Sequence, residues 1–213
     1  MDKRYYLDSL LSRYPQLDYC SKDINEAFEC IKKSFENGHK LLIAGNGGSA
    51  ADSEHAVGEL MKSFVLPRKL KKTQYEALKA VDEEMGSFIA ENLQGALPAI
   101  SLTGQSSLQT AFINDVVPEL IFAQQVNGYG NSGDVFWGIS TSGNSKNVIY
   151  AAINAKAKGL KVIGLTGKRE SKLMKYSDIC IRVPETETYK IQELHLPVYH
   201  CLCLMLEDYF FGE

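Results

Sequence analysis

A glycine-rich turn between an apolar run and a helical pattern constrains this chain more than any other stretch. Residues 41–44 contain no polar side chain, which is typical of a buried parallel strand. The next residues are Gly45-Asn46-Gly47-Gly48-Ser49, and a helical pattern follows them. Gly45, Gly47 and Gly48 allow positive φ and a close approach of the backbone to a ligand. Ser49 lies where the helix begins, and the free N–H groups there suit an anion, most often a phosphate.

A second loop of the same design lies downstream. An apolar run at residues 135–139 leads into Ser140-Thr141-Ser142-Gly143-Asn144-Ser145, and helical spacing resumes at residues 147–153. Four hydroxyls at a strand-to-helix turn can surround a phosphate with neutral donors. For either loop alone, an ordinary turn with a helix-capping serine is the alternative. Two such loops in one sheet favour the phosphate.

Neither loop contains the glycine pattern G-x-G-x-x-G or the phosphate-loop pattern G-x-x-x-x-G-K-[ST]. We therefore expect a single phosphate on a small molecule, and no nucleotide cofactor. A nucleotide-binding Rossmann protein is a distant alternative.

The bulk properties exclude several classes of protein. The 213 residues fit one domain, and 45% hydrophobic with 23% charged residues are ordinary globular values. The net charge of -3 argues against nonspecific nucleic-acid binding. No apolar run approaches the roughly 20 residues that span a membrane, and the first residues do not resemble a signal peptide, so we expect a cytoplasmic protein. The five cysteines contain no C-x-x-C pair, and we expect reduced, buried thiols.

Strands and helices alternate along the chain. Strands are predicted at residues 41–44, 98–102, 135–139, 161–167 and 179–183. Helices are predicted in two segments over residues 2–38, and at 106–114, 118–126, 147–153, 171–174 and 187–211. This alternation predicts a parallel sheet with helices on both faces, and ligands bind such sheets at the carboxyl ends of the strands. The last helix is apolar almost all round, so we expect it to be buried between subunits.

Residues 65–97 do not follow the alternation of strands and helices. They open with the basic run Pro67-Arg68-Lys69-Leu70-Lys71-Lys72 and continue with two helical stretches. A solvated helical excursion between strands is the favoured interpretation. A lid over the phosphate, with Arg68, Lys69, Lys71 or Lys72 as its contacts, is the alternative.

Two groups of residues could carry chemistry. His55 and Glu59 are four apart, so they share a helix face and could bind a divalent metal or act as acid and base. On spacing alone, an exposed ion pair is the better explanation. On the terminal helix, Gln192 can point to the same region as either His195 or His200. Histidines buried for structural reasons are the alternative there.

These features together resemble a known family. The glycine turn, His55-x-x-x-Glu59, the serine-rich loop and Gln192-Glu193-Leu194-His195 with His200 are similar to the SIS-domain sugar phosphate isomerases. The phosphoheptose (sedoheptulose 7-phosphate) isomerase family is the best match, over nearly the whole chain except residues 65–97. The resemblance implies an α/β three-layer sandwich, flavodoxin-like, with a five-stranded parallel sheet flanked by helices. It implies a single domain over residues 1–213, with a helical extension at about 1–38 and an insertion at about 65–97. It also implies a homotetramer with active sites at subunit interfaces.

The resemblance also assigns roles to residues. It implies one zinc ion per active site, and that Glu59 and His200 exchange protons with the sugar. The implied substrate-binding residues are Asn46, Gly47, Gly48, Ser49, Asp115, Ser140, Thr141, Ser142, Ser145 and Gln192. The implied zinc ligands are His55, Glu59, Gln192 and His200.

The implied activity is aldose–ketose isomerisation of sedoheptulose 7-phosphate to a D-glycero-D-manno-heptose 7-phosphate through an enediolate. Such a reaction needs a base near C2, an acid/base near O1 and O2, and stabilisation of an oxyanion. Glu59 would be the base and His200 its partner, and a metal or Gln192 could polarise the oxygens. A carboxylate bound tightly to zinc is a poorer base, so the two roles of Glu59 compete.

The chain departs from the family pattern near the sugar. Ser63 stands where the family has an arginine, and Tyr189 stands where it has an aspartate. Two alternatives therefore stay open. One is a noncatalytic SIS protein that senses a phosphosugar or binds a partner, against which the retained Glu59 and His200 count. The other is an SIS enzyme for a different sugar phosphate.

Overall fold

The computed structural model describes residues 5–212, and its centre is a five-stranded sheet in the order β2-β1-β3-β4-β5. Every neighbouring pair of strands is parallel. The strands are β1 (Leu41–Ala44), β2 (Ala99–Ser101), β3 (Val135–Ile139), β4 (Lys161–Thr166) and β5 (Ile179–Arg182). The predicted α/β class and the five parallel strands are confirmed.

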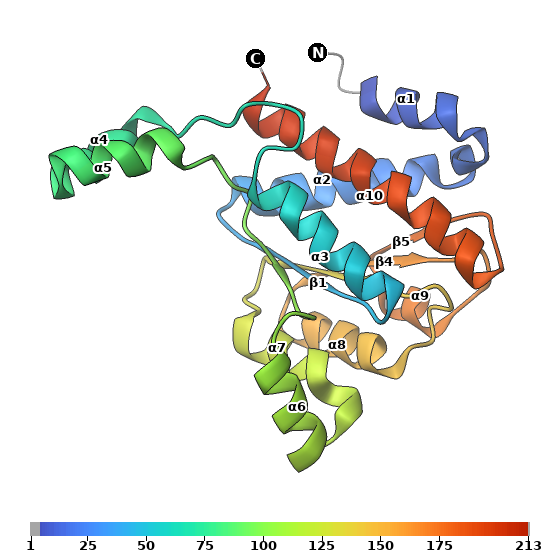
Figure 1. Cartoon of the computed structure of the whole chain (residues 1–213). Helices are drawn as coiled ribbons and strands as arrows, with labels where there is room; N and C mark the ends of the chain where they lie inside the picture. Colours follow the sequence, from blue (N-terminus) through green and yellow to red (C-terminus); the bar gives the residue numbers. More distant parts are fainter. Residues whose placement is uncertain (1–4, 213) are drawn as a thin grey trace.

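Helices cover both faces of the sheet and make three layers (Figure 1). One face carries α1 (Tyr5–Arg13), the 3-10 segment η1 (Pro15–Cys20), α2 (Ser21–Glu36), α3 (Gly48–Met61) and α10 (Thr188–Phe211). The other carries α7 (Ile121–Tyr129), α8 (Lys146–Ala157) and α9 (Lys172–Tyr176), with α6 (Ser106–Asp115) and the 3-10 segment η2 (Pro118–Leu120) beside α7. A hairpin of α4 (Lys72–Val81) and α5 (Glu83–Asn92) projects from this body.

The uninterrupted apolar strands are explained by burial on both faces. Leu41 and Ile43 of β1 join the core under α1, α2, α3 and α10, whereas Leu42 and Ala44 join the core under α7 and α8. Successive strand residues point to opposite faces, so each strand must supply both cores.

The order of the strands creates a crevice at one end of the sheet. From β1 the chain passes to β2 on one side, and β3 then adds on the other side of β1. The register pairs Ala44 with Gly138, so the loops after β1 and β3 leave the sheet side by side. A sheet of this kind binds ligands at such a switch point.

The terminal helix α10 is buried largely by its own chain. It contacts α1, α2 and α3 along its length, and Val198, Tyr199 and Leu202 are at most 1% exposed. Its buried side chains thus pack within the chain, whereas Leu196 and Tyr209 on the same helix are 41% and 42% exposed. Within residues 5–212, no helix is both long and apolar enough to span a membrane.

All five cysteines are free, as expected. Cys20, Cys201 and Cys203 are buried, and burial raises the pKa of the Cys20 and Cys201 thiols to about 12. The expectation of full burial is wrong for Cys30 and Cys180, which are partly exposed.

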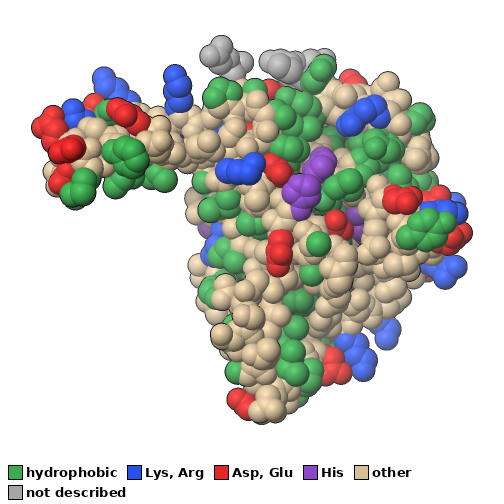
Figure 2. Space-filling view, in the orientation of Figure 1, with side chains coloured by type: hydrophobic (Ala, Val, Ile, Leu, Met, Phe, Trp, Pro, Cys, Tyr) green, Lys and Arg blue, Asp and Glu red, His purple; other side chains and the backbone are tan. Residues whose placement is uncertain are grey.

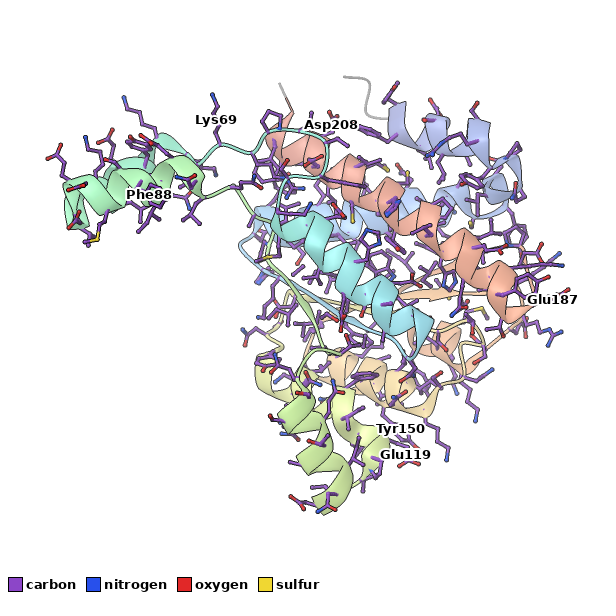
Figure 3. All side chains as sticks on the ribbon, viewed as in Figure 1. Lys69, Phe88, Glu119, Tyr150, Glu187 and Asp208 are labelled. Atoms are coloured by element: carbon purple, nitrogen blue, oxygen red, sulfur yellow. The ribbon has the colours of Figure 1, made fainter. Side chains whose placement is uncertain are left out.

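The α4–α5 hairpin packs mainly on itself. Asp82 begins α5 by accepting a hydrogen bond from the Met85 amide at 2.7 Å. Val81, Met85 and Phe88 are 88%, 64% and 68% exposed, and Figure 3 shows Phe88 on the projecting segment. The hairpin leaves the body near the C-terminal end of α3, whereas the glycine turn lies at the N-terminal end (Figure 1). In this chain the segment is therefore not a lid over the two loops.

Arg68, one of the lid candidates, is instead part of a buried ion pair. Its side chain and that of Glu207 are both fully buried, and Arg68 Nε donates to Glu207 Oε1 at 2.8 Å. The other two guanidinium nitrogens donate to the Leu60 and Glu59 carbonyls at 2.6 and 2.7 Å. These carbonyls lie in the last turn of α3, so Arg68 caps that helix.

Glu207 uses its remaining acceptor capacity on the backbone. Its two oxygens accept from the amides of Phe64, Val65 and Leu66 at 2.8, 2.9 and 3.2 Å. A buried charge is tolerated when it is paired and hydrogen-bonded in this way. The pair therefore fastens the end of α3 and the next segment to α10.

We predict that Glu207→Gln lowers the free energy of unfolding by about 3 kcal/mol, because it leaves the Arg68 charge buried without its partner. Urea denaturation at neutral pH measures the change. Glu83→Gln is the matched control, because the Glu83 side chain is 88% exposed and pairs only with Lys79. Equal midpoints for the two variants would contradict the prediction.

His195 is completely buried where α10 packs on the sheet. It is 0% exposed, and neither ring nitrogen has a hydrogen bond of good geometry. Burial lowers the pKa of His195 to about 4, and the nearby Thr166 backbone only partly opposes this shift. His195 is therefore neutral at pH 7 in the folded chain.

This burial predicts that stability falls as the solution is acidified. Below about pH 6.5 the unfolded chain protonates His195, whereas the folded chain resists until about pH 4. Between these values the contribution of this residue to the free energy of unfolding decreases by about 3 kcal/mol. Urea titrations at pH 7, 5.5 and 4.5 should show a shallower loss for His195→Gln than for the natural chain. The same slope in both would contradict this account.

Candidate active site

The two predicted loops are joined by a pair of side-chain amides. Asn46 donates to Asn147 Oδ1 at 2.9 Å, and Asn147 donates back to Asn46 Oδ1 at 2.8 Å. Asn147 also accepts from the Val148 amide at 3.0 Å, which fixes it at the start of α8. Sequence reasoning missed Asn147, although its place just after the serine-rich loop was a signal. The structure thus brings the two loops together.

The serine-rich loop is organised by its own hydroxyls. Ser140 and Ser145 share a hydrogen bond at 3.1 Å, and the Ser142 hydroxyl accepts from the Asn144 amide at 3.1 Å. Gly143 has φ +61°, and a Cβ there would lie 2.1 Å from Ser171 Oγ. The loop is therefore rigid, with its hydroxyls near the carboxyl end of β3.

Only one of the three glycines in the first turn has positive φ. Gly47 does, at +57°, whereas Gly45 and Gly48 do not. These two are required by close contacts instead. A Cβ at Gly45 would lie 2.4 Å from the Ser49 carbonyl oxygen, and one at Gly48 would lie 2.4 Å from Gln192 Nε2. Gln192 therefore lies directly over the start of α3.

A cavity of about 220 Å³ lies against the serine-rich loop. Thr141 and Ser142 line it together with Lys168 and Arg169, which follow β4. Sequence reasoning missed these two cations. A basic pair after the neighbouring strand was the available signal. Glu170 and Glu185 also line the cavity, so its two cations are balanced by two carboxylates.

A second group of polar side chains lies further along α3 and α10. His55 Nε2 is 3.2 Å from Glu59 Oε1, and His55 Nδ1 is 2.9 Å from the Tyr199 hydroxyl. The His200 ring lies edge-on to the His55 ring, with centroids 5.0 Å apart. Figure 2 shows histidine side chains reaching the surface on this face. The structure thus places Glu59 and His200, the predicted proton-transfer residues, in one cluster.

The two groups of residues are separated along parallel helices. Gln192 meets Gly48, Tyr199 meets His55, and Cys203 Sγ lies 3.9 Å from the Ala56 carbonyl oxygen, so α3 and α10 run in the same direction. Seven residues of helix separate Gly48 from His55, which is about 10 Å. A small molecule that binds its phosphate at the loops can therefore extend along the helices toward Glu59.

The surroundings favour a neutral His200. Burial lowers the pKa of His200, and the neighbouring His55 lowers it further, while Glu59 opposes the shift. His200 Nε2 is buried without a hydrogen-bond partner. Lys62 Nζ lies 3.6 Å from Glu59 Oε2 and brings a positive charge to the cluster.

Asp115 and the two departures from the family pattern have contacts outside the two loops and the histidine cluster. Asp115 ends α6, after the edge strand β2, and its carboxylate accepts from the Asn114 side chain at 2.8 Å. Of the two departures, Ser63 donates its amide to Gln94 Oε1 at 2.8 Å, and Tyr189 is 56% exposed.

The implied zinc ligands have the donor atoms that zinc prefers, but the four side chains are not all brought together. His55, Glu59 and His200 are nitrogen and oxygen donors of the kind that zinc prefers. Among the described residues, Glu59 Oε2 and His200 Nε2 are buried without a hydrogen-bond partner, although Lys62 Nζ lies 3.6 Å from Glu59 Oε2. However, no three His, Cys, Asp or Glu side chains among residues 5–212 are arranged to hold a metal, and Gln192 lies over Gly48 instead.

Known proteins resemble this chain in sequence and in fold. The SIS domain model matches residues 77–167. The phosphoheptose isomerase of Synechocystis is 36% identical over 207 residues, which is 97% of this chain and 92% of that protein. The phosphoheptose isomerase of Rhodospirillum rubrum is 37% identical over 205 residues, covering 96% and 95%.

Solved structures agree. The phosphoheptose isomerase of Francisella tularensis superposes with a TM-score of 0.75 at 31% identity, and that of Neisseria gonorrhoeae with 0.73 at 29%. Each match covers 96% of this chain and 95% of the other. The sequence similarity extends over nearly the full length of both chains, and the structures share one fold. The chain therefore belongs to the phosphoheptose isomerase family of SIS-domain proteins.

Proposed function

We propose that this protein is an aldose–ketose isomerase that converts sedoheptulose 7-phosphate to D-glycero-D-manno-heptose 7-phosphate. The observation that carries the proposal is the placement of two polar groups along the parallel helices α3 and α10, the second of which begins at His55, about 10 Å beyond Gly48, with Glu59 one further turn along α3. One is the pair of loops at the carboxyl ends of β1 and β3, and the other is the cluster of Glu59 and His200. The similarity to proteins named phosphoheptose isomerase supports the same activity.

The loops would hold the phosphate. Ser49, at 3% exposed, lies at the N-terminus of α3, where backbone N–H groups and the helix dipole favour an anion. The hydroxyls of the serine-rich loop would donate further hydrogen bonds, two of them, from Thr141 and Ser142, at the edge of the adjoining cavity. Gln192, over Gly48, would contact the sugar beside the phosphate.

Glu59 and His200 would move the protons. Glu59 would take the proton from C1 of the open-chain ketose and return it at C2, passing through an enediolate. His200 is neutral near pH 7 because its pKa is lowered, so its ring can accept and return the hydroxyl proton at O1 and O2. Its unpartnered Nε2 is the atom available for this exchange.

We also propose a zinc ion held by His55, Glu59 and His200, with Gln192 as a fourth ligand once it leaves Gly48. When bound, zinc supplies a Lewis acid that polarises the substrate oxygens. The nitrogen and oxygen donors of these side chains support this assignment. A zinc ion on Glu59 and His200 would compete with their role in proton transfer, because it would use the same atoms.

We propose further that the protein is a cytoplasmic homotetramer with active sites at subunit interfaces. The exposed apolar side chains of the hairpin, Val81, Met85 and Phe88, support an assembly, because they have no cover within the chain.

Proton NMR with sedoheptulose 7-phosphate in deuterated water tests the isomerase. The zinc-supplemented natural chain should produce an aldose anomeric signal. Glu59→Gln and His200→Asn should each lower kcat by at least about 100-fold, because each removes a proton-transfer group.

Glu83→Gln, on the exposed hairpin, is the matched control and should keep full activity. Saturable binding of the sugar phosphate by the natural chain without any new sugar signal would contradict the isomerase and favour a sensor.

The close packing of Gln192 on Gly48 gives a second prediction. Gly48→Ala places a Cβ 2.4 Å from Gln192 Nε2, so the amide must move. We expect KM for the sugar phosphate to rise at least about tenfold, the size of one lost polar contact. Gly58→Ala, in the same helix, meets nothing within 4 Å, so it should leave KM unchanged and raise stability by up to about 1 kcal/mol. Equal KM values for the two variants would contradict the role of Gln192.

A further inference from the structure

The α4–α5 hairpin carries an apolar stripe on its outer surface. On α5, Met85, Phe88 and Ile89 are 64%, 68% and 42% exposed. At 100° per residue their side chains lie within an arc of about 100°, so they form one stripe along the helix. The buried residues of α5 are Gly86 and Ala90, which lie on another side, and a Cβ at Gly86 would lie 2.1 Å from a carbonyl oxygen of α4. The stripe is therefore not the face that packs on α4.

A hairpin of two short helices needs a further layer to be stable. The helices α4 and α5 have ten residues each, and isolated helices shorter than about 12 residues are marginal in water. Most of the stability of such helices comes from the packing of an apolar face. Figure 2 shows hydrophobic side chains along one side of the projecting segment. We therefore expect another molecule to cover the stripe.

The tip of the hairpin is acidic. The turn between the two helices and the start of α5 carry Asp82, Glu83 and Glu84 in succession, and Figure 2 shows acidic side chains gathered there. Lys79 lies 3.4 Å from Glu83 and balances one of these three charges. Beside them, Val81 is 88% exposed. The tip thus offers an apolar side chain surrounded by excess negative charge.

The base of the hairpin is basic. Lys69, Lys71 and Lys72 lie where the chain enters α4, and all three are exposed. None of them forms an ion pair with another described residue. Glu91 and Lys69 both line a cavity of about 580 Å³ at this base, so Glu91 balances one of the three charges. The base thus has an excess of positive charge that the chain itself leaves unpaired.

These features favour one arrangement of two copies of the chain. An interface between identical chains related by a two-fold axis must be complementary to itself. Two hairpins that ran in the same direction would bring like charges together at both ends. Two hairpins that run in opposite directions place each acidic tip against the basic base of the partner, and the apolar stripes meet between the ends. Charge complementarity therefore selects the antiparallel pair.

The spacing along the chain agrees with this pairing. Phe88 lies at the middle of α5, which runs from Glu83 to Asn92. In an antiparallel pair, residues equally far from the two-fold axis oppose each other. With Phe88 at the axis, Val81 is seven residues before it and Gly95 seven residues after it. The tip of one hairpin then reaches the base of the other, where the cavity lies.

We propose that the α4–α5 hairpin is an assembly arm, which pairs antiparallel with the hairpin of a second copy of this chain and forms a four-helix bundle with Phe88 at its two-fold axis. The partner's Val81 enters the cavity, whose apolar lining includes Leu70 and Leu93. The lysines at the base contact the acidic tip of the partner. The proposal names one contact of the assembly proposed above and does not rest on the isomerase activity.

Cross-linking through α5 tests whether the stripes meet. Ile89→Cys places a thiol on the stripe, in a full-length background in which Cys30→Ser and Cys180→Ser remove the two partly exposed thiols. A short bismaleimide should convert most chains to covalent dimers. Ser87→Cys is the matched control, because Ser87 lies about 160° around the helix from Met85, and it should cross-link at least about tenfold less.

Charge reversal tests the direction of the pairing. On the Ile89→Cys background, Glu83→Lys with Glu84→Lys makes both ends of the hairpin basic, and Lys69→Glu with Lys71→Glu makes both ends acidic. Each variant alone should cross-link at least about tenfold less, because like charges then oppose each other. Co-expression of the two variants should restore cross-linking between them to within about twofold of the Ile89→Cys chain, because each tip again meets a base of opposite charge.

Two further variants complete the experiment. Phe88→Asp should abolish the cross-link through Ile89→Cys, because it places two carboxylates at the axis. Glu26→Lys reverses a half-exposed charge on α2, outside the hairpin, and should leave the cross-link unchanged.

Equal cross-linking of Ile89→Cys and Ser87→Cys would overturn the arm, and so would charge-reversed variants that fail to restore each other on co-expression. A natural chain that sediments as a monomer would also overturn it and would leave the stripe to a different partner. If the natural chain turned over no sugar phosphate while the cross-links and their restoration appeared as expected, the isomerase function would fail and the assembly arm would stand.

Discussion

The buried ion pair of Arg68 and Glu207 sets the relation between the two helices on which the site depends. One end of the pair caps α3 just past Glu59, and the other is part of α10, seven residues beyond His200. Sliding either helix by one turn would break a charged contact that no water can replace, because both side chains are fully buried. Apolar packing alone tolerates such shifts more readily. The pair therefore fixes the spacing between Glu59 and His200.

The other end of α3 is fixed by different means. There the turn packs closely against α3 and α10, because Gly45 leaves room for the Ser49 backbone and Gly48 leaves room for the Gln192 side chain. The amide pair of Asn46 and Asn147 ties this turn to the neighbouring loop. The helix α3 thus connects the proposed phosphate site at its N-terminus with the proposed proton-transfer residue Glu59. The distance between them is set by helix geometry and does not depend on any flexible loop.

Much of this could be predicted from the sequence, because the strongest patterns were local. The apolar run before Gly45 and the hydroxyls after Ile139 marked both strands and both loops, and the spacing of His55 and Glu59 placed them on one face. Features that depend on distant partners could not be predicted. Arg68 lies in a basic run that looked solvated, and only the fold brings it to Glu207, 139 residues away.

Tyr199, the residue before His200, could not be recognised from the sequence either, because its partner is distant along the chain. In an apolar helix it is indistinguishable from a packing residue until His55 is seen against its hydroxyl. The glycine turn shows the same dependence on distant partners. Positive φ is a general property of glycine, but Gly45 and Gly48 are required by what packs against them, which a local pattern does not reveal.

The base of the α4–α5 hairpin has a consequence for how this chain can vary. The Gly95 amide donates to the Arg68 carbonyl at 2.7 Å, so the segments that enter and leave the hairpin are hydrogen-bonded to each other at its base. Two residues on, the Leu97 amide donates to the Leu60 carbonyl at 3.0 Å and returns the chain to the body. Residues 69–94 thus form a loop that is closed at its base. Its length has little effect on the sheet, because lengthening a closed loop adds little to the entropy cost of folding. This is a point at which the protein can gain or lose a whole substructure, and so acquire new surface, while the catalytic framework stays unaltered.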